Sequence, residues 1–210
     1  MSMYFNEQTA KQLTLVATLR ARKEKIDDLK QALLSLMDKT RAEEGSVTYH
    51  LYVDRDDSQN FIFHETWASQ ELWEKHMESS HIKNFFAGAD ALLDGEPTMF
   101  RLERSLAPAP VIDKEALVLF AYNRAKAGKE KEWQRILENL IEPTLAENGC
   151  LHYELHRDRE DARNFMFHET WKTVETWNDH MQAGHLKALL EIIDDYTEYG
   201  IRVVKAQALD

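Results

Sequence analysis

Apolar side chains recur with steps of three or four residues in two stretches of the sequence, 25–44 and 129–148. This spacing places them on one face of a helix and predicts an amphipathic helix in each stretch. Gly45 and Gly149 follow directly, where many helices end in a left-handed residue. Pro143 is expected to kink or shorten the second helix. The two apolar stripes are Ile26, Leu29, Leu33, Leu36 and Met37, and Trp133, Ile136, Leu137, Leu140 and Ile141.

Other segments are expected to form strands, in which successive side chains point to opposite faces. Ser69 and Thr173 are good N-caps, so a second helix is expected to begin after each of them. The resulting order is βαββαβ, a ferredoxin-like split unit. In the strand at 60–66, Phe61, Phe63, Glu65 and Trp67 share one face and Ile62, His64 and Thr66 share the other. The remaining strands are expected at 13–20, 46–54, 98–103, 116–124 and 199–205.

The second half of the sequence repeats the first half. Residues 45–83 align with residues 149–187 without a gap, at a constant shift of 104, and about half of the positions are identical. The segment Phe-Ile-Phe-His-Glu-Thr-Trp at 61–67 reappears as Phe-Met-Phe-His-Glu-Thr-Trp at 165–171. Solenoid units are only about 20–50 residues long. The long period therefore predicts two small α+β domains that arose by duplication.

The repeat also predicts how the two domains associate. Alternating Ala and Pro at 107–110 indicates a short, stiff linker, so we expect module 1 at 1–106, a linker at 107–112 and module 2 at 113–210. The sheet face with Ile62, His64 and Thr66 is too apolar to lie in water. Two ferredoxin-like modules in tandem can cover these faces by pairing their antiparallel sheets as an intrachain pseudo-dimeric barrel. Pairing between chains is the alternative, and a further homo-oligomer is compatible with either.

Composition and charge narrow the function. The chain has 43% hydrophobic and 30% charged residues, as is usual for soluble globular proteins. A formal net charge of −11 argues against nucleic-acid partners and against docking on anionic membranes. No apolar run approaches the roughly 20 residues of a spanning helix, and the N-terminus lacks the apolar core of a signal peptide, so a cytoplasmic location is expected. Cys150, the only cysteine, is interpreted as a small strand residue.

One motif occurs in both halves: Asn-Phe-x-Phe-x-Glu-x-Trp, followed by a helix that bears His-x-x-x-x-His. It resembles the central signature of antibiotic-biosynthesis-monooxygenase (ABM) domains of the dimeric α/β-barrel superfamily. The resemblance covers nearly the whole chain apart from the N-terminal dozen residues and the linker. The matching segments are 60–81 and 164–185, preceded by Glu-x-Gly at 43–45 and 147–149 and by Tyr49 and Tyr153.

Characterised members of this family include monooxygenases that oxidise polyketide quinols and related polyphenols without metal or flavin. The resemblance implies a reaction in which a small aromatic substrate, as its phenolate, passes an electron to O2, with O2 as co-substrate and no cofactor. The sequence has neither a Gly-x-Gly-x-x-Gly motif nor a Walker loop, in agreement with this. A non-catalytic small-molecule-binding or structural protein is the alternative, because the superfamily carries several chemistries.

The resemblance implies a catalytic asparagine on the first strand of a module, where an amide can hold a substrate oxygen. Asn123 occupies that strand in module 2, and the matching residue in module 1 is Leu19, so we expect the site in module 2. His180 and His185 are candidates to take a proton from a phenol, and Trp171 would line a planar substrate. Each of these residues also has a purely structural interpretation: a polar strand end, a hydrogen-bonded histidine or a core aromatic.

The other expected substrate contacts are aromatic or acidic. Glu65 and Glu169 would either orient a helix histidine or form a salt bridge to Arg101 or Lys205. His185 and its counterpart in module 1 are expected to face the apolar stripe of their helix. His185 therefore ranks above His180 as a candidate for a direct role. The predicted substrate-binding residues are Tyr153, Phe165, Phe167, Glu169, Trp177, Trp67, Glu65 and His81.

No metal site is expected from the sequence. Two metal-binding histidines on a helix favour a spacing of four, and the spacing of five found here should turn the rings apart. His64 and His168 would meet across paired sheets, without a compact ligand cluster in the sequence. Haem binding or degradation is the weaker alternative, because Phe86 and Leu190, which stand near the axial-ligand position of haem-degrading relatives, cannot ligate iron.

Overall fold

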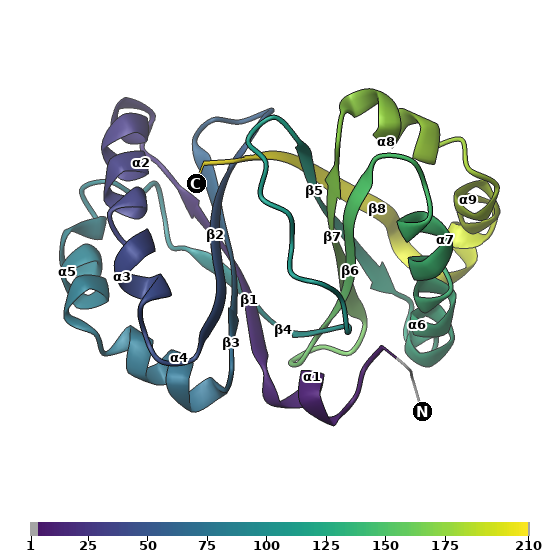
Figure 1. Ribbon diagram of the computed structural model, residues 1–210, viewed down its shortest axis with the longest axis horizontal. Helices are drawn as coiled ribbons and strands as arrows, with labels where there is room; N and C mark the ends of the chain where they lie inside the picture. Colours follow the sequence, from purple (N-terminus) through teal and green to yellow (C-terminus); the bar gives the residue numbers. More distant parts are fainter. Residues whose placement is uncertain (1–3, 210) are drawn as a thin grey trace.

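Eight strands in residues 4–209, the part of the chain that the computed structural model describes, pair in one closed antiparallel barrel. Their order is β1-β3-β2-β8-β5-β7-β6-β4, and moving four places along it converts each strand into its counterpart in the other module. The two modules are therefore related by a pseudo-twofold axis, as predicted for an intrachain pseudo-dimer (Figure 1). The strands are β1 (Leu13–Arg20), β2 (Ser46–Asp54), β3 (Asn60–Trp67), β4 (Thr98–Arg104), β5 (Leu117–Ala125), β6 (Cys150–Asp158), β7 (Asn164–Trp171) and β8 (Thr197–Ala208).

The last strand of each module closes the barrel against the other module. β4 pairs with β1 and also with β6, where Leu102 lies opposite Asp158. β8 pairs with β5 and also with β2, where Tyr52 lies opposite Ala208. Closure gives each of the eight described strands a partner on both sides, which reduces the edge that could template aggregation. The connection at 105–116 runs between the modules (Figure 1).

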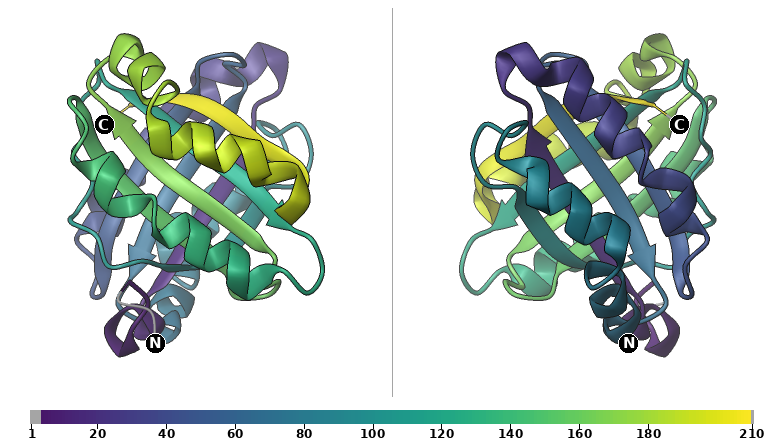
Figure 2. Two further views of the ribbon diagram at one scale, coloured as in Figure 1. Left: turned by 90° about the vertical axis from the view of Figure 1, so that its right-hand side faces the viewer. Right: turned by 90° about the vertical axis from the view of Figure 1, so that its left-hand side faces the viewer.

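Helices cover the outer face of each sheet. α2 to α5 lie on the first sheet and α6 to α9 on the second (Figure 2). The predicted stripes are buried there, with Leu33 and Trp133 at 0% exposure, except that Ile26 and Ile136 are only partly buried. Alternation on β3 is confirmed, since Phe63 belongs to the core under the helices and Ile62 to the core inside the barrel. The helices are α1 (Glu7–Lys11), α2 (Ile26–Leu34), α3 (Met37–Arg41), α4 (Gln70–Met77), α5 (Ser80–Ala89), α6 (Glu130–Glu138), α7 (Ile141–Leu145), α8 (Val174–His180) and α9 (Gly184–Tyr196), and the short turn η1 (Lys23–Lys25) precedes α2.

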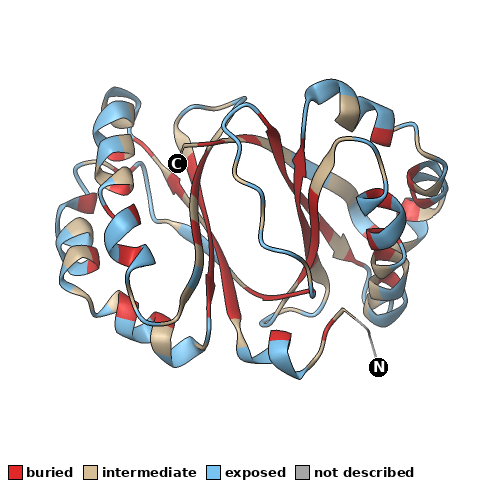
Figure 3. Cartoon of the chain, in the orientation of Figure 1, coloured by how far each residue is buried: buried red, intermediate tan, exposed pale blue. Residues whose placement is uncertain are grey.

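The long helices expected from periodicity are interrupted. The first divides at Ser35 and Leu36 into α2 and α3, and the second divides at Asn139 and Leu140 into α6 and α7. Pro143 lies inside α7 and does not cause the division, because module 1 is divided at the same place without a proline. Figure 3 shows that the buried residues concentrate on the strands of the barrel and that the outer surfaces of the helices are exposed.

The second helix of each module is also divided. Ser69 and Thr173 cap the first pieces as predicted, and each accepts a hydrogen bond from the backbone N–H three residues on. α4 ends at Met77 and α5 begins at Ser80, so the two motif histidines of a module lie on different helices. Gly149, which has φ of +86°, confirms the left-handed residue expected before the second strand.

Candidate active site

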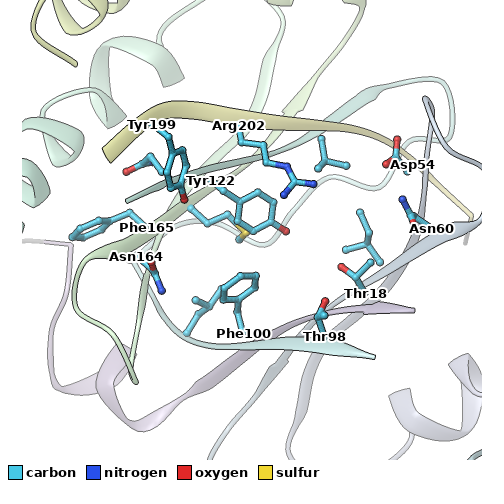
Figure 4. Close-up of a pocket in the computed structure, with 15 residues that line it drawn as sticks. Thr18, Asp54, Asn60, Thr98, Phe100, Tyr122, Asn164, Phe165, Tyr199 and Arg202 are labelled. Atoms are coloured by element: carbon cyan, nitrogen blue, oxygen red, sulfur yellow. The ribbon is translucent and has the colours of Figure 1, made fainter. Parts of the chain in front are cut away.

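A cavity of about 700 Å³ opens at one end of the barrel, on the pseudo-twofold axis. Thr18 and Tyr122 line it and are related by the repeat shift, and so are Thr98 and Arg202. Figure 4 shows Arg202 and Tyr122 projecting into the same space, with the ring of Phe100 on the opposite wall. The rings of Phe100 and Tyr122 lie 5.6 Å apart. The two halves of the cavity therefore differ chemically: module 2 supplies a phenol and a guanidinium where module 1 supplies two threonines.

Asn123 lies in the wall of this cavity and is 1% exposed. Its Oδ1 accepts a hydrogen bond of 2.6 Å from Nε1 of Trp133 on α6. An indole N–H can only donate, so this bond establishes which amide atom is the oxygen. The Nδ2 of Asn123 has no hydrogen-bond partner among the described residues. Leu19 occupies the equivalent position, opposite Phe61 as Asn123 is opposite Phe165, so module 1 lacks this amide.

His180 and His185 lie between the outer face of the second sheet and its helices. Nδ1 of His180 is 2.7 Å and Nε2 of His185 is 3.0 Å from the same oxygen of Glu147. The break between α8 and α9 brings the two rings to 5.8 Å, so the expectation that a spacing of five separates them is wrong. His180 is the more buried of the two. Burial lowers the pKa of His180, although Glu147 opposes this.

The same cluster recurs in module 1. Nδ1 of His76 is 2.7 Å from Glu43 and Nε2 of His81 is 3.3 Å from it. Burial, helped by His81, lowers the pKa of His76 to about 4. Because the geometry is repeated in both modules, it indicates a role that both modules share.

Glu169 is buried beside this cluster in module 2. Its Oε2 accepts a hydrogen bond of 2.8 Å from Nε1 of Trp171. Burial raises the pKa of Glu169 to about 7, and Glu147 adds to the rise while Trp171 opposes it. Glu65 is bonded to Trp67 in the same way, at 2.7 Å, and burial likewise raises its pKa to about 7.

In the structure, Glu65 and Glu169 do not contact the partners that were expected from the sequence. The motif histidines bind Glu43 and Glu147 rather than Glu65 and Glu169. The expected cations also point elsewhere: the guanidinium of Arg101 lies 4.5 Å from the ring of Trp73, and Nζ of Lys205 lies 4.8 Å from that of Trp177.

The predicted site residues of module 2 fall into two groups. Phe165 lies opposite Asn123 on the β5–β7 ladder, whereas Glu169 lies opposite Leu119, four residues away. Four residues of strand span roughly 13 Å, so one reacting atom cannot touch both Asn123 and the carboxyl of Glu169. The second group packs around His180, with Tyr153 stacked on Phe167 at 4.4 Å and Trp171 4.7 Å from the His180 ring.

A third polar cluster fills the middle of the barrel. His64 and His168 do meet there, with ring centroids 4.3 Å apart. Burial, followed by the neighbouring histidines, holds the pKa of both rings well below the ordinary value, so both are neutral. Glu154 lies beside them, and contacts with His156, His152 and Arg104 outweigh its burial and hold its pKa low.

Sequence reasoning missed Glu43 and Glu147 as histidine partners and missed Glu154 altogether. The first two belong to the Glu-x-Gly segments, which stand at the repeat shift of 104. Glu154 belongs to an alternation on β6 in which His152, Glu154 and His156 share one face. That pattern already placed three polar side chains inside the barrel.

Comparison with known proteins adds the following. The family model described as antibiotic biosynthesis monooxygenase matches twice, at residues 12–88 and 116–191. The "Putative monooxygenase YcnE" of Bacillus subtilis is 28% identical over 93 residues, which cover 44% of this chain and 98% of that protein. An uncharacterised protein of Synechocystis is 24% identical over 92 residues, 41% of this chain, and the chain spans only 63% of its length.

Solved structures match along most of the chain. A "Putative monooxygenase" from Fusobacterium nucleatum superposes with a TM-score of 0.85 at 19% identity, covering 95% of this chain and 93% of that one. An "anthrone oxidase-like protein" superposes with a TM-score of 0.74 at 13% identity, covering 95% and 92%. At these identities the likeness shows the fold. None of the helices in residues 4–209 has the length and apolar character needed to cross a membrane.

Proposed function

The chain belongs to the antibiotic biosynthesis monooxygenase family, with one domain in each half, and on this premise we propose that it oxidises a small quinol or polyphenol with O2 and without a cofactor. The observation that carries the proposal is the cavity at the barrel end. Its volume of about 700 Å³ suits a planar substrate of a few rings. Phe100 and Tyr122 give it aromatic walls. Asn123 and Phe165 also line it, from the sheet face that the helices cover, and the Nδ2 of Asn123 has no partner among the described residues.

The polar groups of the cavity suit a phenolate. The guanidinium of Arg202 stabilises a negatively charged oxygen and so lowers the pKa of a bound phenol. The Nδ2 of Asn123 is the proposed donor for the oxygen that is added. Burial raises the pKa of Tyr122, against the effect of Arg202, so its hydroxyl stays protonated and can donate. Asp54 lines the same cavity and is the proposed acceptor of the phenol proton.

The proposed reaction balances without an external reductant. When a phenol becomes a quinone, the ring carbon and the hydroxyl each lose one hydrogen. One atom of O2 enters the ring, and the other leaves as water with these two hydrogens. The phenolate itself supplies the electrons, so the residues have to bind and deprotonate the substrate and keep water away from it.

Oxygen uptake by metal-stripped protein tests the proposal, using a panel of quinols and anthrone-like phenols. We expect uptake above autoxidation, and we expect Asn123→Ala and Arg202→Gln to lower kcat/KM by roughly 100-fold, as the loss of one transition-state donor does. Arg135→Gln, on the outer surface of α6, is the matched control and should leave the rate unchanged. Binding of these phenols without uptake would support the non-catalytic alternative.

The histidine clusters are the second candidate location for the same chemistry. Both modules carry one, so a reaction there should fall by about half in His185→Ala and be lost when His81→Ala is added. A reaction in the cavity should survive both changes and disappear in Asn123→Ala. The two sets of variants therefore distinguish the cavity from the clusters.

A further inference from the structure

Five ionisable side chains meet at the centre of the barrel, far from the helices. They are His64, His168, Glu154, His156 and His152, and each is at most 1% exposed. One ligand atom each from His64, His168 and Glu154 lie within 4.8 Å of one another. From this arrangement we propose that the barrel binds one divalent transition-metal cation through His64, His168 and Glu154.

The first argument is the lack of hydrogen-bond partners. Both ring nitrogens of His168, Nδ1 of His64 and Oε2 of Glu154 are buried and have no hydrogen-bond partner among the described residues. Buried polar atoms are nearly always bonded to protein, water or an ion, so these unbonded atoms require an explanation. A neutral imidazole has one N–H and one lone pair, so a single cation can take one lone pair from each ring and one from Glu154.

The second argument is the spacing. Nε2 of His156 lies 3.2 Å from Nε2 of His64, which is a hydrogen-bonding distance, and this contact leaves Nδ1 of His64 for the cation. One ligand atom from each of the three proposed ligands lies within 4.8 Å of the other two.

The third argument is the donor set. Imidazole nitrogens with one carboxylate favour Zn²⁺, Co²⁺, Ni²⁺ or Fe²⁺ over Ca²⁺ and Mg²⁺, which take oxygen ligands. The other oxygen of Glu154, Oε1, is held by Arg104 at 2.5 Å. Such an outer partner fixes the orientation of a ligating carboxylate, and it leaves Oε2 for the cation.

The two rival groups of this chain are satisfied already. In the clusters of Glu43 and Glu147 the histidines contact carboxylates and threonine hydroxyls at 2.7–3.3 Å. The barrel centre, by contrast, lies close to the cavity. Ile62 and Met166, which line the cavity, are two residues along their strands from His64 and His168, or roughly 7 Å.

The site would join the modules, because His64 lies on β3 of module 1 and its other ligands lie on β6 and β7 of module 2. It goes beyond the proposed oxidation and does not rest on it. Metal-stripped protein that still consumes O2 leaves the metal site standing, and protein without oxygenase activity can still bind the cation.

Titration of the stripped full-length protein with Co²⁺ and Zn²⁺ is the test. We expect one tight equivalent per chain, the visible absorption of four-coordinate Co²⁺, and a melting temperature that rises with metal concentration. His168→Phe, which keeps the ring packed on Phe120, and Glu154→Gln should weaken binding by roughly 10–100-fold or more. The control His185→Ala, in the rival cluster, should leave the affinity unchanged.

Anomalous scattering from Co²⁺-soaked wild-type crystals gives a reading that needs no variant to fold. A peak between His64 and His168 is the expected result. A peak beside Glu147 or Glu43, ordered water at the barrel centre without metal, or no stoichiometric binding in solution would each overturn the proposal.

Discussion

Replacing Glu169 by Gln should stabilise the protein, and by an amount that depends on pH. Burial raises the pKa of this carboxyl from 4.5 to about 7, so between those two pH values the native state holds a proton that the unfolded chain has lost. The stabilisation due to that proton is complete below about pH 4.5 and is lost as pH rises through 7. A change in pKa of this size corresponds to about 3 kcal/mol.

Glutamine keeps an oxygen that can accept the Trp171 hydrogen bond and never ionises. The free energy of unfolding of Glu169→Gln minus that of wild type should therefore rise by about 3 kcal/mol between pH 4.5 and pH 8. For a chain of this size we expect roughly 6–12 °C in Tm. Taking the difference cancels the opposite contribution of histidines such as His180, whose pKa burial lowers.

The assay is urea unfolding at a series of pH values, followed by tryptophan fluorescence and circular dichroism. Glu191→Gln, at an exposed position on α9, is the matched control and should give a flat difference. A flat difference for Glu169→Gln as well would refute the reasoning, because it would mean that the carboxyl ionises as readily in the native state as in the unfolded chain.

Two further predictions concern the backbone and the closure of the barrel. Gly149→Ala should lower the free energy of unfolding by about 2–4 kcal/mol, because φ is +86° and the new Cβ would lie 2.5 Å from Thr176 Cγ2. Gly200→Ala, at φ of +73° in open space, should lower it by only about 1 kcal/mol in the same denaturation assay. Equal losses would contradict the steric account. Residues 1–110 expressed alone should self-associate, because β2 and β4 lose the partner strands β8 and β6; a monodisperse monomer by light scattering would contradict this.

The fold could be predicted from the sequence because several local signals agree. The repeat at a shift of 104 defined two modules, and the alternation of Phe63 with Ile62 assigned one sheet face to the helices and the other to the barrel. What could not be predicted is where the helices break. The interruption between His180 and His185 depends on how α8 and α9 pack on the sheet, and it turns a spacing that seemed to separate two rings into a pair around Glu147.

The candidate site was predictable in part. The register places Asn123 opposite Phe165 and gives module 1 Leu19, as the alignment indicated. The cavity beside Asn123 arises only when β4 and β8 close the barrel, so Phe100 and Arg202 carried no signal in a single module. His152 and Glu154 did carry one, since their alternation on β6 pointed polar groups inward, yet only the closed barrel shows what they meet.

Fusing two modules into one chain removes a constraint that symmetry imposes on dimers. In a homodimer, a residue next to the twofold axis always faces its own copy, so an arginine there would oppose a second arginine. Here the counterpart of Arg202 is Thr98 and that of Tyr122 is Thr18, because each position can vary separately. A ligand on the axis therefore meets a cationic end and a neutral end, and it can be held in one direction only. Directional binding of this kind selects which end of a substrate reacts, and two identical chains could not provide it at that place.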